Sequence, residues 1–131
     1  MGNVQTKSGD SGLERQRESE LKLLLRGKYI RELKVRQPLD ITPLLPGYAH
    51  MSWKIDFQYE EKVGPRKWTQ VYEDSKAPHT FDGLAQLKAK LVMGRYCPPA
   101  IFRISHRTRD QGIKVDTLTK DLRVDFEKRR Q

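Results

Sequence analysis

The sequence predicts an α+β fold: a small, mainly antiparallel sheet of hairpins, covered by one or two helices, with a flexible N-terminal tail. Residues 52–60 alternate between apolar and polar side chains, which is the pattern of a half-buried strand. A second alternating stretch, 67–74, follows across Gly64-Pro65, which predicts a hairpin. Two stretches with apolar residues at helical spacing, 13–35 and 81–96, supply the helices. Because hairpins dominate the order of elements, the sheet should be largely antiparallel.

Composition indicates one domain and an anionic partner. The chain has 131 residues, of which 33% are charged, and its net charge is +9. Residues 1–12 are rich in glycine, serine and polar side chains, so they are expected to form a flexible tail before a single domain at 13–131. A basic balance of this size favours nucleic acid, an anionic leaflet or an acidic protein surface. Charge alone does not choose among these three partners.

The first residues match the pattern for N-myristoylation. In Met-Gly-Asn-Val-Gln-Thr-Lys, removal of Met1 exposes the amino group of Gly2 for acylation. Asn3 belongs to the uncharged stretch after this glycine, and Thr6 supplies the small hydroxyl that the motif requires. Lys7 adds a positive charge that suits a tail directed to a membrane. We therefore expect a covalent myristate on Gly2 and no other cofactor.

The first helix, predicted over 13–35, carries a basic C-terminal half. Gly27 weakens the middle of this helix and is the point at which it would split in two. The candidate membrane- or anion-binding residues in this half are Lys22, Arg26, Lys28, Arg31, Lys34 and Arg36. One interpretation is a second membrane signal beside the acyl chain. The other is a solvated helix face with ion pairs between residues four apart, and both remain open.

The rest of the chain supplies loops, strands and a second helix. Three prolines predict a loop over 37–50. The helix at 81–96, capped by Thr80 or Asp82, should cover the sheet with an apolar face, and Pro98-Pro99 ends it. That face comprises Phe81, Leu84, Leu87, Leu91 and Val92. Further strands are predicted at 100–105, 112–118 and 121–128.

Motifs for catalysis or metal binding are not evident in the sequence. His50, His79 and His106 lack the spacing of a metal site and are expected to be loop histidines. Carboxylates alternate with apolar residues on the predicted strands, so they should face water rather than form an acid–base pair. Cys97, the single cysteine, excludes an internal disulfide and should lie at a helix end. We therefore expect no enzyme activity and no metal site.

Nucleic-acid binding is an alternative to membrane binding. Aromatic residues are concentrated in the hairpin beside cations, and an aromatic sheet of this kind can stack single-stranded bases. Core packing is the commoner reason for aromatics that alternate on strands. Loop cations can contact phosphates without recognising bases. The candidate nucleic-acid contacts are Lys62, Arg66, Lys67, Arg107 and Arg109.

The acylated tail and the order of elements resemble viral matrix proteins. Retroviral matrix domains share the myristoylation start but are helical. The hairpin from Trp53 to Tyr72, the helix from Phe81 to Gly94 and the strand that ends at Ser105 are closer to the matrix proteins of negative-strand RNA viruses. The resemblance covers about half of the chain and lies in organisation. It implies self-association into homo-oligomers, contact with nucleocapsid or RNA, and a location in the virion.

The hydrophobic pattern of the chain favours a peripheral membrane protein. The chain contains no apolar run near the roughly 20 residues of a spanning helix, so membrane contact is expected to be peripheral. The expected site is the inner leaflet, at the cytoplasmic face of a host plasma membrane.

Two alternative functions remain open. One is a myristoylated adaptor that recruits a partner through the 38–48 loop. The other is a basic RNA-binding protein or silencing suppressor whose Gly2 is incidental.

Overall fold

The predicted α+β class is confirmed by the order of elements. The computed structural model describes residues 11–127. Along the chain it contains α1 (Ser11–Arg26), β1 (Ile30–Asp40), β2 (Ser52–Gly64), β3 (Lys67–Ser75), α2 (Gly83–Tyr96), β4 (Ile101–Arg107) and β5 (Ile113–Thr117). The predicted tail lies largely outside these residues, and α1 begins at Ser11, two residues before its predicted start.

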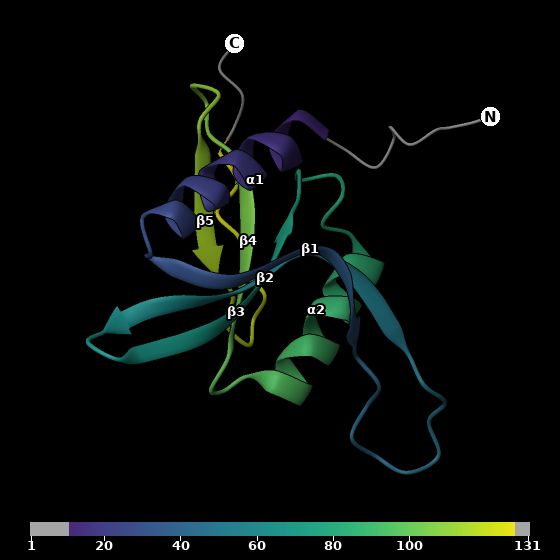
Figure 1. Ribbon diagram of the computed structural model, residues 1–131. Coiled ribbons are helices and arrows are strands. Elements are labelled where there is room, and N and C mark those ends of the chain that lie inside the picture. The colour runs from purple at the N-terminus through teal and green to yellow at the C-terminus, as the bar shows by residue number, and fades with distance from the viewer. Residues whose placement is uncertain (1–10, 128–131) are drawn as a thin grey trace, which may run out of the picture.

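The five strands form one sheet in sequence order, with a helix on each face (Figure 1). All neighbouring strands are antiparallel except β3 and β4, which are parallel because α2 connects them as a crossover. The sheet is thus mainly antiparallel, as predicted. Val71 and Tyr72 show the two faces, because adjacent strand residues point in opposite directions. Val71 is buried with Leu21 of α1, whereas Tyr72 is buried with Ala89 of α2.

The predicted helix at 13–35 is wrong beyond Arg26, because the chain turns and becomes β1. The turn bonds close the end of α1: Lys28 N–H donates to Leu25 O and Tyr29 N–H donates to Leu24 O. Lys28 has a φ of 64°, the left-handed conformation typical of helix ends. Gly27 precedes it and lets the Tyr29 ring lie close to the turn, since a Cβ at 27 would be 2.8 Å from that ring.

A β-bulge explains why this strand resembled a helix in the sequence. The pairing of β1 with β2 shifts by one residue between Arg31 and Lys34, where Glu32 has a φ of 56°. The extra residue brings Leu33 to the same face as Ile30, and both pack in the cluster beneath α1. Apolar residues three apart therefore share one face of a strand here, although that spacing ordinarily indicates a helix.

The end of the chain packs without forming the strand predicted at 121–128. The described residues after β5 are extended or turned, with no ladder of their own. Leu122, Val124 and Phe126 still point inward and pack against the cluster under α2. Asp125 N–H donates to a side-chain oxygen of Asp116 on β5. The alternation thus reflects apolar packing rather than a paired strand.

The apolar face predicted for α2 is partly wrong. Asp82 is the N-cap, which was one of the two predicted alternatives. Its carboxylate accepts a hydrogen bond from Ala85 N–H at 3.0 Å. Leu84 and Leu87 are 62% and 51% exposed, while Ala85, Ala89 and Val92 are buried. Small alanine side chains allow the helix to lie close to the sheet, which turns the larger leucines outward.

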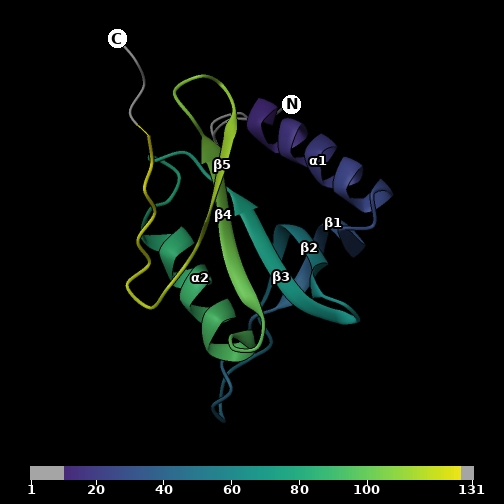
Figure 2. The ribbon, with the colours of Figure 1, turned by 90° about the vertical axis from the view of Figure 1, so that its left-hand side faces the viewer.

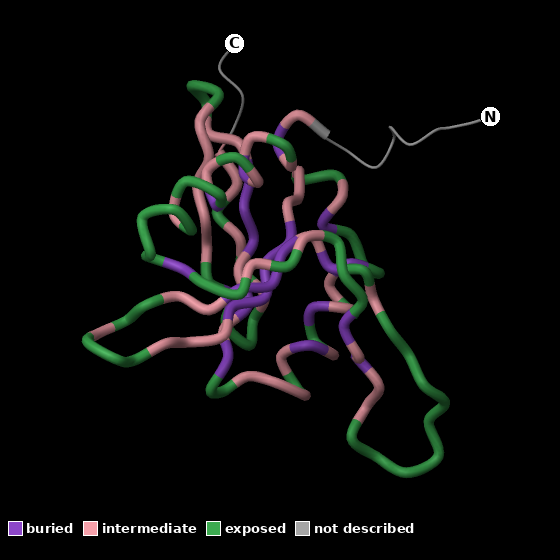
Figure 3. The backbone as a smooth tube through the Cα atoms, in the orientation of Figure 1, coloured by how far each residue is buried: buried purple, intermediate pink, exposed green. Residues whose placement is uncertain are grey.

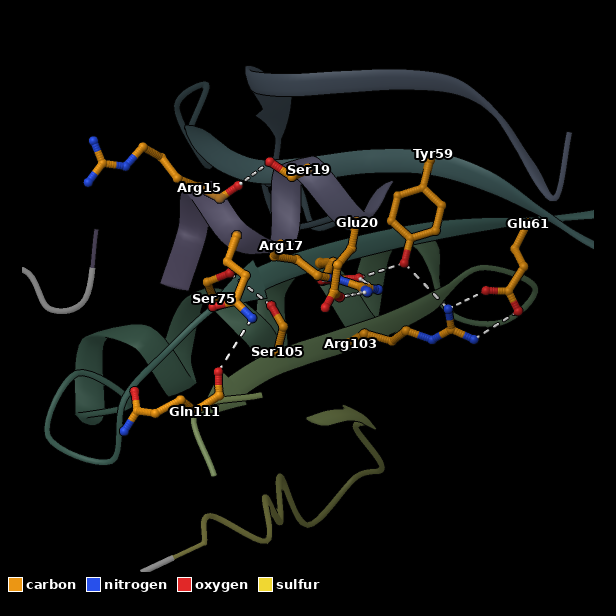
Figure 4. Close-up of polar contacts among 12 residues, drawn as sticks. Arg15, Arg17, Ser19, Glu20, Tyr59, Glu61, Ser75, Arg103, Ser105 and Gln111 are labelled. Atoms are coloured by element: carbon orange, nitrogen blue, oxygen red, sulfur yellow. Dashed lines mark hydrogen bonds and ion pairs between the residues drawn. The ribbon is translucent and has the colours of Figure 1, made fainter. Parts of the chain in front are cut away.

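A buried ion pair fixes α1 on the sheet, and Figure 4 shows its arginine, Arg17, directed toward the hydroxyl of Tyr59. Arg17 donates from Nε and Nη2 to the two carboxylate oxygens of Glu73, at 2.6 and 3.0 Å. Tyr59 Oη donates to the same carboxylate at 2.5 Å. Glu73 and Tyr59 are 0% and 1% exposed. Burial and the charge of Glu73 raise the pKa of Tyr59, so the hydroxyl remains a donor.

We predict that Glu73→Ala lowers the free energy of unfolding by about 3–5 kcal/mol, because it removes the buried carboxylate and leaves the Arg17 guanidinium with only the part-exposed Glu20 as a charged partner. Urea denaturation followed by circular dichroism measures this change. Glu60→Ala is the matched control: it breaks the Arg31 pair, which is half exposed on the arginine side, and should cost less than about 1 kcal/mol. Equal losses in the two variants would contradict a special role for the buried pair.

Candidate functional site

The structure brings the predicted hairpin tip next to the end of α1. The β2–β3 hairpin turns at Pro65 and Arg66, and Arg66 takes a φ of 62° there. Near this tip, Lys62 N–H donates to Tyr29 O at 3.0 Å, across to the turn between α1 and β1. Figure 1 shows both turns on the same side of the molecule. Two basic segments that are far apart in the sequence thus form one continuous edge.

This basic edge combines cations with exposed apolar side chains. Its cations are Arg26, Lys28, Lys62, Arg66 and Lys67, all exposed. Beside them, Leu23, Tyr29 and Val63 are 61%, 65% and 49% exposed. Figure 3 shows exposed backbone at both the hairpin tip and the α1–β1 turn. Cations interleaved with apolar groups suit the headgroup region of an anionic leaflet, where both kinds of side chain gain a partner.

The carboxylates near the edge are mostly engaged elsewhere. Glu60 pairs with Arg31 at 2.5 Å, and Glu61 pairs with Arg103 of β4. Arg31 also stacks on Trp68, with its guanidinium carbon 4.2 Å from the ring centroid. Glu32 is exposed and has no ion pair among the residues that the structure describes. The cations of the basic edge have no ion pair within that part of the chain, so a positive surface remains.

The predicted membrane-binding set divides into two groups. Lys22 pairs with Glu18 at 3.0 Å, and Arg36 pairs with Glu14 and Glu18, so these cations are largely neutralised within the fold. Arg31 is engaged with Glu60, as described above. Arg26 and Lys28 belong to the basic edge, and Lys34 lies further along β1. Of the predicted helix pairs between residues four apart, the structure forms Lys22–Glu18, whereas Arg31 and Arg36 lie on β1 and pair with residues far away in the sequence.

The predicted nucleic-acid contacts are also divided. Lys62, Arg66 and Lys67 lie together at the hairpin tip, but Arg107 and Arg109 lie at the β4–β5 loop. Arg107 donates to Gln16 in the first half of α1 and to Gln111 O, and Arg109 N–H donates to Glu127. Since a helix rises about 1.5 Å per residue, the ten residues of α1 from Gln16 to Arg26 separate this loop from the basic edge by roughly 15 Å. Figure 2 shows the two regions apart.

The remaining predicted sites are the tail and the proline-rich loop. Gly2, Asn3, Thr6 and Lys7 lie outside the described residues. The chain from 42 to 51 is an exposed loop whose base is held by Arg95, which donates to Thr42 O at 2.9 Å. Its apolar side chains are exposed: Leu44 69%, Leu45 65%, Tyr48 56% and Met51 38%.

Two carboxylates predicted to face water instead lie together inside the sheet. Asp74 is 4% exposed and accepts from Asp56 N–H at 3.0 Å, while Asp56 accepts from Ser75 N–H at 2.9 Å. Lys76 pairs with Asp74 at 3.0 Å. Burial, and next the charge of Asp74, raise the pKa of Asp56 from 3.8 to about 9. These side chains join β2 to β3 where their ladder ends, which is a structural role.

His106 is not the loop histidine that the sequence predicted. It lies on β4, is 1% exposed, and its Nε2 is 2.8 Å from Asp116 Oδ2. Its ring makes an edge contact with Phe126, with centroids 5.0 Å apart. Within residues 11–127, His, Cys, Asp and Glu form no group of three or more that could hold a metal ion. Asp116 and Phe126 thus hold this histidine in the fold, while its buried Nδ1 has no hydrogen-bond partner among the described residues.

The carboxylate pair predicts a particular pH dependence. The folded state keeps a proton on Asp56 that the unfolded chain loses above about pH 4, so stability from this group falls as pH rises toward 9. Asp56→Asn mimics the protonated acid and should remove this fall. We expect the variant to gain at least about 1 kcal/mol over the wild type between about pH 5 and pH 8, measured by urea denaturation. Asp110→Asn, an exposed loop control, should show no gain, and a parallel pH profile in Asp56→Asn would contradict the shift.

Comparison with known proteins does not place this chain in a family: no family model, curated protein or solved structure matches it. A functional assignment therefore depends on the geometry described above. Among the predicted sites that fall within residues 11–127, the basic edge is the one where the fold gathers several predicted residues from separate segments. It is the candidate functional site of this protein.

Proposed function

We propose that this protein is an N-myristoylated peripheral membrane protein that binds the inner leaflet of a host membrane through its acyl chain and the basic edge. The observation that supports this function is the meeting of the α1–β1 turn and the β2–β3 tip. That meeting joins cations that form no ion pair within residues 11–127 to exposed apolar side chains on one surface. Neither helix among the described residues is both long and apolar enough to cross a bilayer.

The energetics require both signals. A single myristoyl chain gives a partition constant of only about 10⁴ M⁻¹, which is marginal. Each cation held near an anionic leaflet adds about 1 kcal/mol, so two or three cations of the basic edge would strengthen binding roughly a hundredfold. Exposed Leu23, Tyr29 and Val63 would add apolar contact at the headgroup boundary.

The proposed role of the membrane-bound protein is viral matrix assembly, with self-association and nucleocapsid contact. Resemblance in the order of elements supports this part of the proposal. Oligomerisation would present several acyl chains and several basic edges at once, which increases avidity without any new contact. Arg107 and Arg109 lie away from the basic edge, so contact with nucleocapsid or RNA through them is compatible with a membrane-bound edge.

A second candidate function is a myristoylated adaptor. The exposed loop at 42–51 favours it, because Leu44, Leu45 and Tyr48 each expose more than half of their surface. Such a loop would bind an apolar groove of a partner while the basic edge holds the membrane. An adaptor stays monomeric on vesicles, whereas a matrix protein assembles there, so the oligomeric state on vesicles separates the two functions.

We predict that Lys62→Gln with Lys67→Gln weakens binding to vesicles containing phosphatidylserine by about 30-fold, because two cations of about 1 kcal/mol each are lost. Vesicle co-sedimentation of myristoylated protein measures the partition constant. Arg15→Gln with Lys54→Gln is the matched control: these exposed cations lie outside the basic edge, and we expect less than about a threefold loss.

The same assay separates the membrane from nucleic acid. Vesicles of phosphatidylcholine alone should bind the wild type and the edge variant equally, and added salt should weaken only binding to anionic vesicles. An edge variant that loses RNA binding but keeps full binding to anionic vesicles would contradict the proposed function. It would support the RNA-binding alternative instead.

We predict that Gly2→Ala abolishes acylation. In eukaryotic cells the wild type should lose Met1 and gain about 210 Da, while the variant should lack that gain. Intact mass spectrometry measures the modification, and fractionation measures location. The wild type should pellet with membranes and the variant should be soluble, since the basic edge alone is a weak signal. Equal fractionation of the two proteins would rule out an acyl anchor.

A further inference from the structure

A cavity between α2 and the turn after β5 has the character of a small ligand site. Its volume is about 320 Å³, within the roughly 300–1,000 Å³ typical of small-molecule pockets. It is lined by Lys90, Met93, Gly94, Cys97, Lys120 and Leu122. Figure 2 shows α2 beside the segment that follows β5. The lining thus comes from two elements that are separate in the sequence and from neither segment of the basic edge.

The walls are apolar and the charges are cationic. Met93, Cys97 and Leu122 are partly buried and pack against the core cluster under α2. Lys90 and Lys120 are exposed and have no ion pair within residues 11–127. The nearby acid, Asp121, is engaged: it accepts from Thr119 Oγ1 and lies 3.9 Å from Arg123 Nε. An apolar cavity with two uncompensated ammonium groups suits a chain with one anionic end.

Gly94 keeps this cavity open. It lies in the last turns of α2, where a Cβ would meet no atom within 4 Å. Lys90 and Gly94 are four residues apart, so they share one face of α2, and Cys97 at the C-cap lines the same cavity. A larger residue at 94 would project into the space between this face and Leu122. Glycine lowers the stability of the helix at this position. In return, the missing side chain leaves open space beside α2.

We infer that this cavity binds a free aliphatic anion, such as a medium-chain fatty acid, with the chain along Met93, Cys97 and Leu122 and the carboxylate between Lys90 and Lys120. The myristate on Gly2 fits these charges less well, because an amide-linked acyl chain has no anionic end to place between the two ammonium groups. Charge complementarity therefore favours the free acid.

Cys97 provides the measurement, since it is the single cysteine and lines the cavity. Unacylated protein is labelled with a maleimide in the presence of decanoate, and the rate of Cys97 modification is followed by mass. We expect decanoate to slow labelling at least tenfold in a saturable manner, and 1-decanol at the same concentration to be at least tenfold less potent. Acetate should give no protection.

Two pairs of variants test the site. Gly94→Leu should abolish protection by decanoate without unfolding the protein, because leucine favours a helix and meets no atom there. Gly83→Leu, the same substitution in the first turn of α2 and outside the cavity, should leave protection intact. Lys90→Gln with Lys120→Gln should remove the preference for decanoate over decanol, and Lys88→Gln should preserve it.

Three results would overturn the inference. The first is no saturable protection of the wild type by decanoate. The second is equal protection in Gly94→Leu, which would place the ligand elsewhere. The third is full protection of Cys97 in the myristoylated protein without added ligand, which would assign the cavity to the protein's own acyl chain. Because the first assays use unacylated protein without vesicles, failure here is distinguishable from failure of membrane binding.

Discussion

The ion pair between Arg17 and Glu73 is the interaction on which the rest of the structure depends. It is buried on both sides, and it links α1 to the centre of the sheet, with Tyr59 as a third partner. A buried charge without its partner costs several kcal/mol, so α1 has one favourable position along the sheet. That position places the C-terminal end of α1 beside the β2–β3 hairpin. The basic edge is therefore a consequence of a contact in the interior.

Two local features then carry the chain from this helix into the sheet. Left-handed Lys28 ends α1, and the bulge at Glu32 re-aligns β1 so that Leu33 faces the cluster that contains Ile30. Together they set Tyr29 against Lys62 across the edge. The membrane-binding role that we propose for the basic edge needs no cavity or catalytic group, only cations without an ion pair among the described residues, next to apolar groups. Its chemistry is that of a headgroup layer, anionic outside and apolar beneath.

Much of the fold could be predicted from the sequence, because the signals were local. Alternation at 52–60 and 67–74 depends on side chains of adjacent residues, as do the turn at Gly64-Pro65 and the cap at Asp82. The strand that begins at Ile30 could not be predicted. Its β-bulge puts apolar residues three apart on one face, and that spacing in the sequence indicates a helix. The prediction of a strand at 121–128 was wrong for a related reason. Alternation shows which side chains are buried, and Leu122, Val124 and Phe126 are partly buried although this segment forms no hydrogen-bonded ladder.

The sequence by itself determined the number of cations, the apolar periodicity of most elements and the candidate acylation motif at Gly2. Only the tertiary structure decided which charges remain free. Arg36 of β1 forms ion pairs with Glu14 and Glu18 of α1. Glu73 is buried rather than solvated, because its partner Arg17 comes from another segment, and Asp74 is buried as well. Ion pairing is set by distances in space, which local sequence does not encode. The surface offered to an anionic partner is thus the charge that the fold leaves uncompensated.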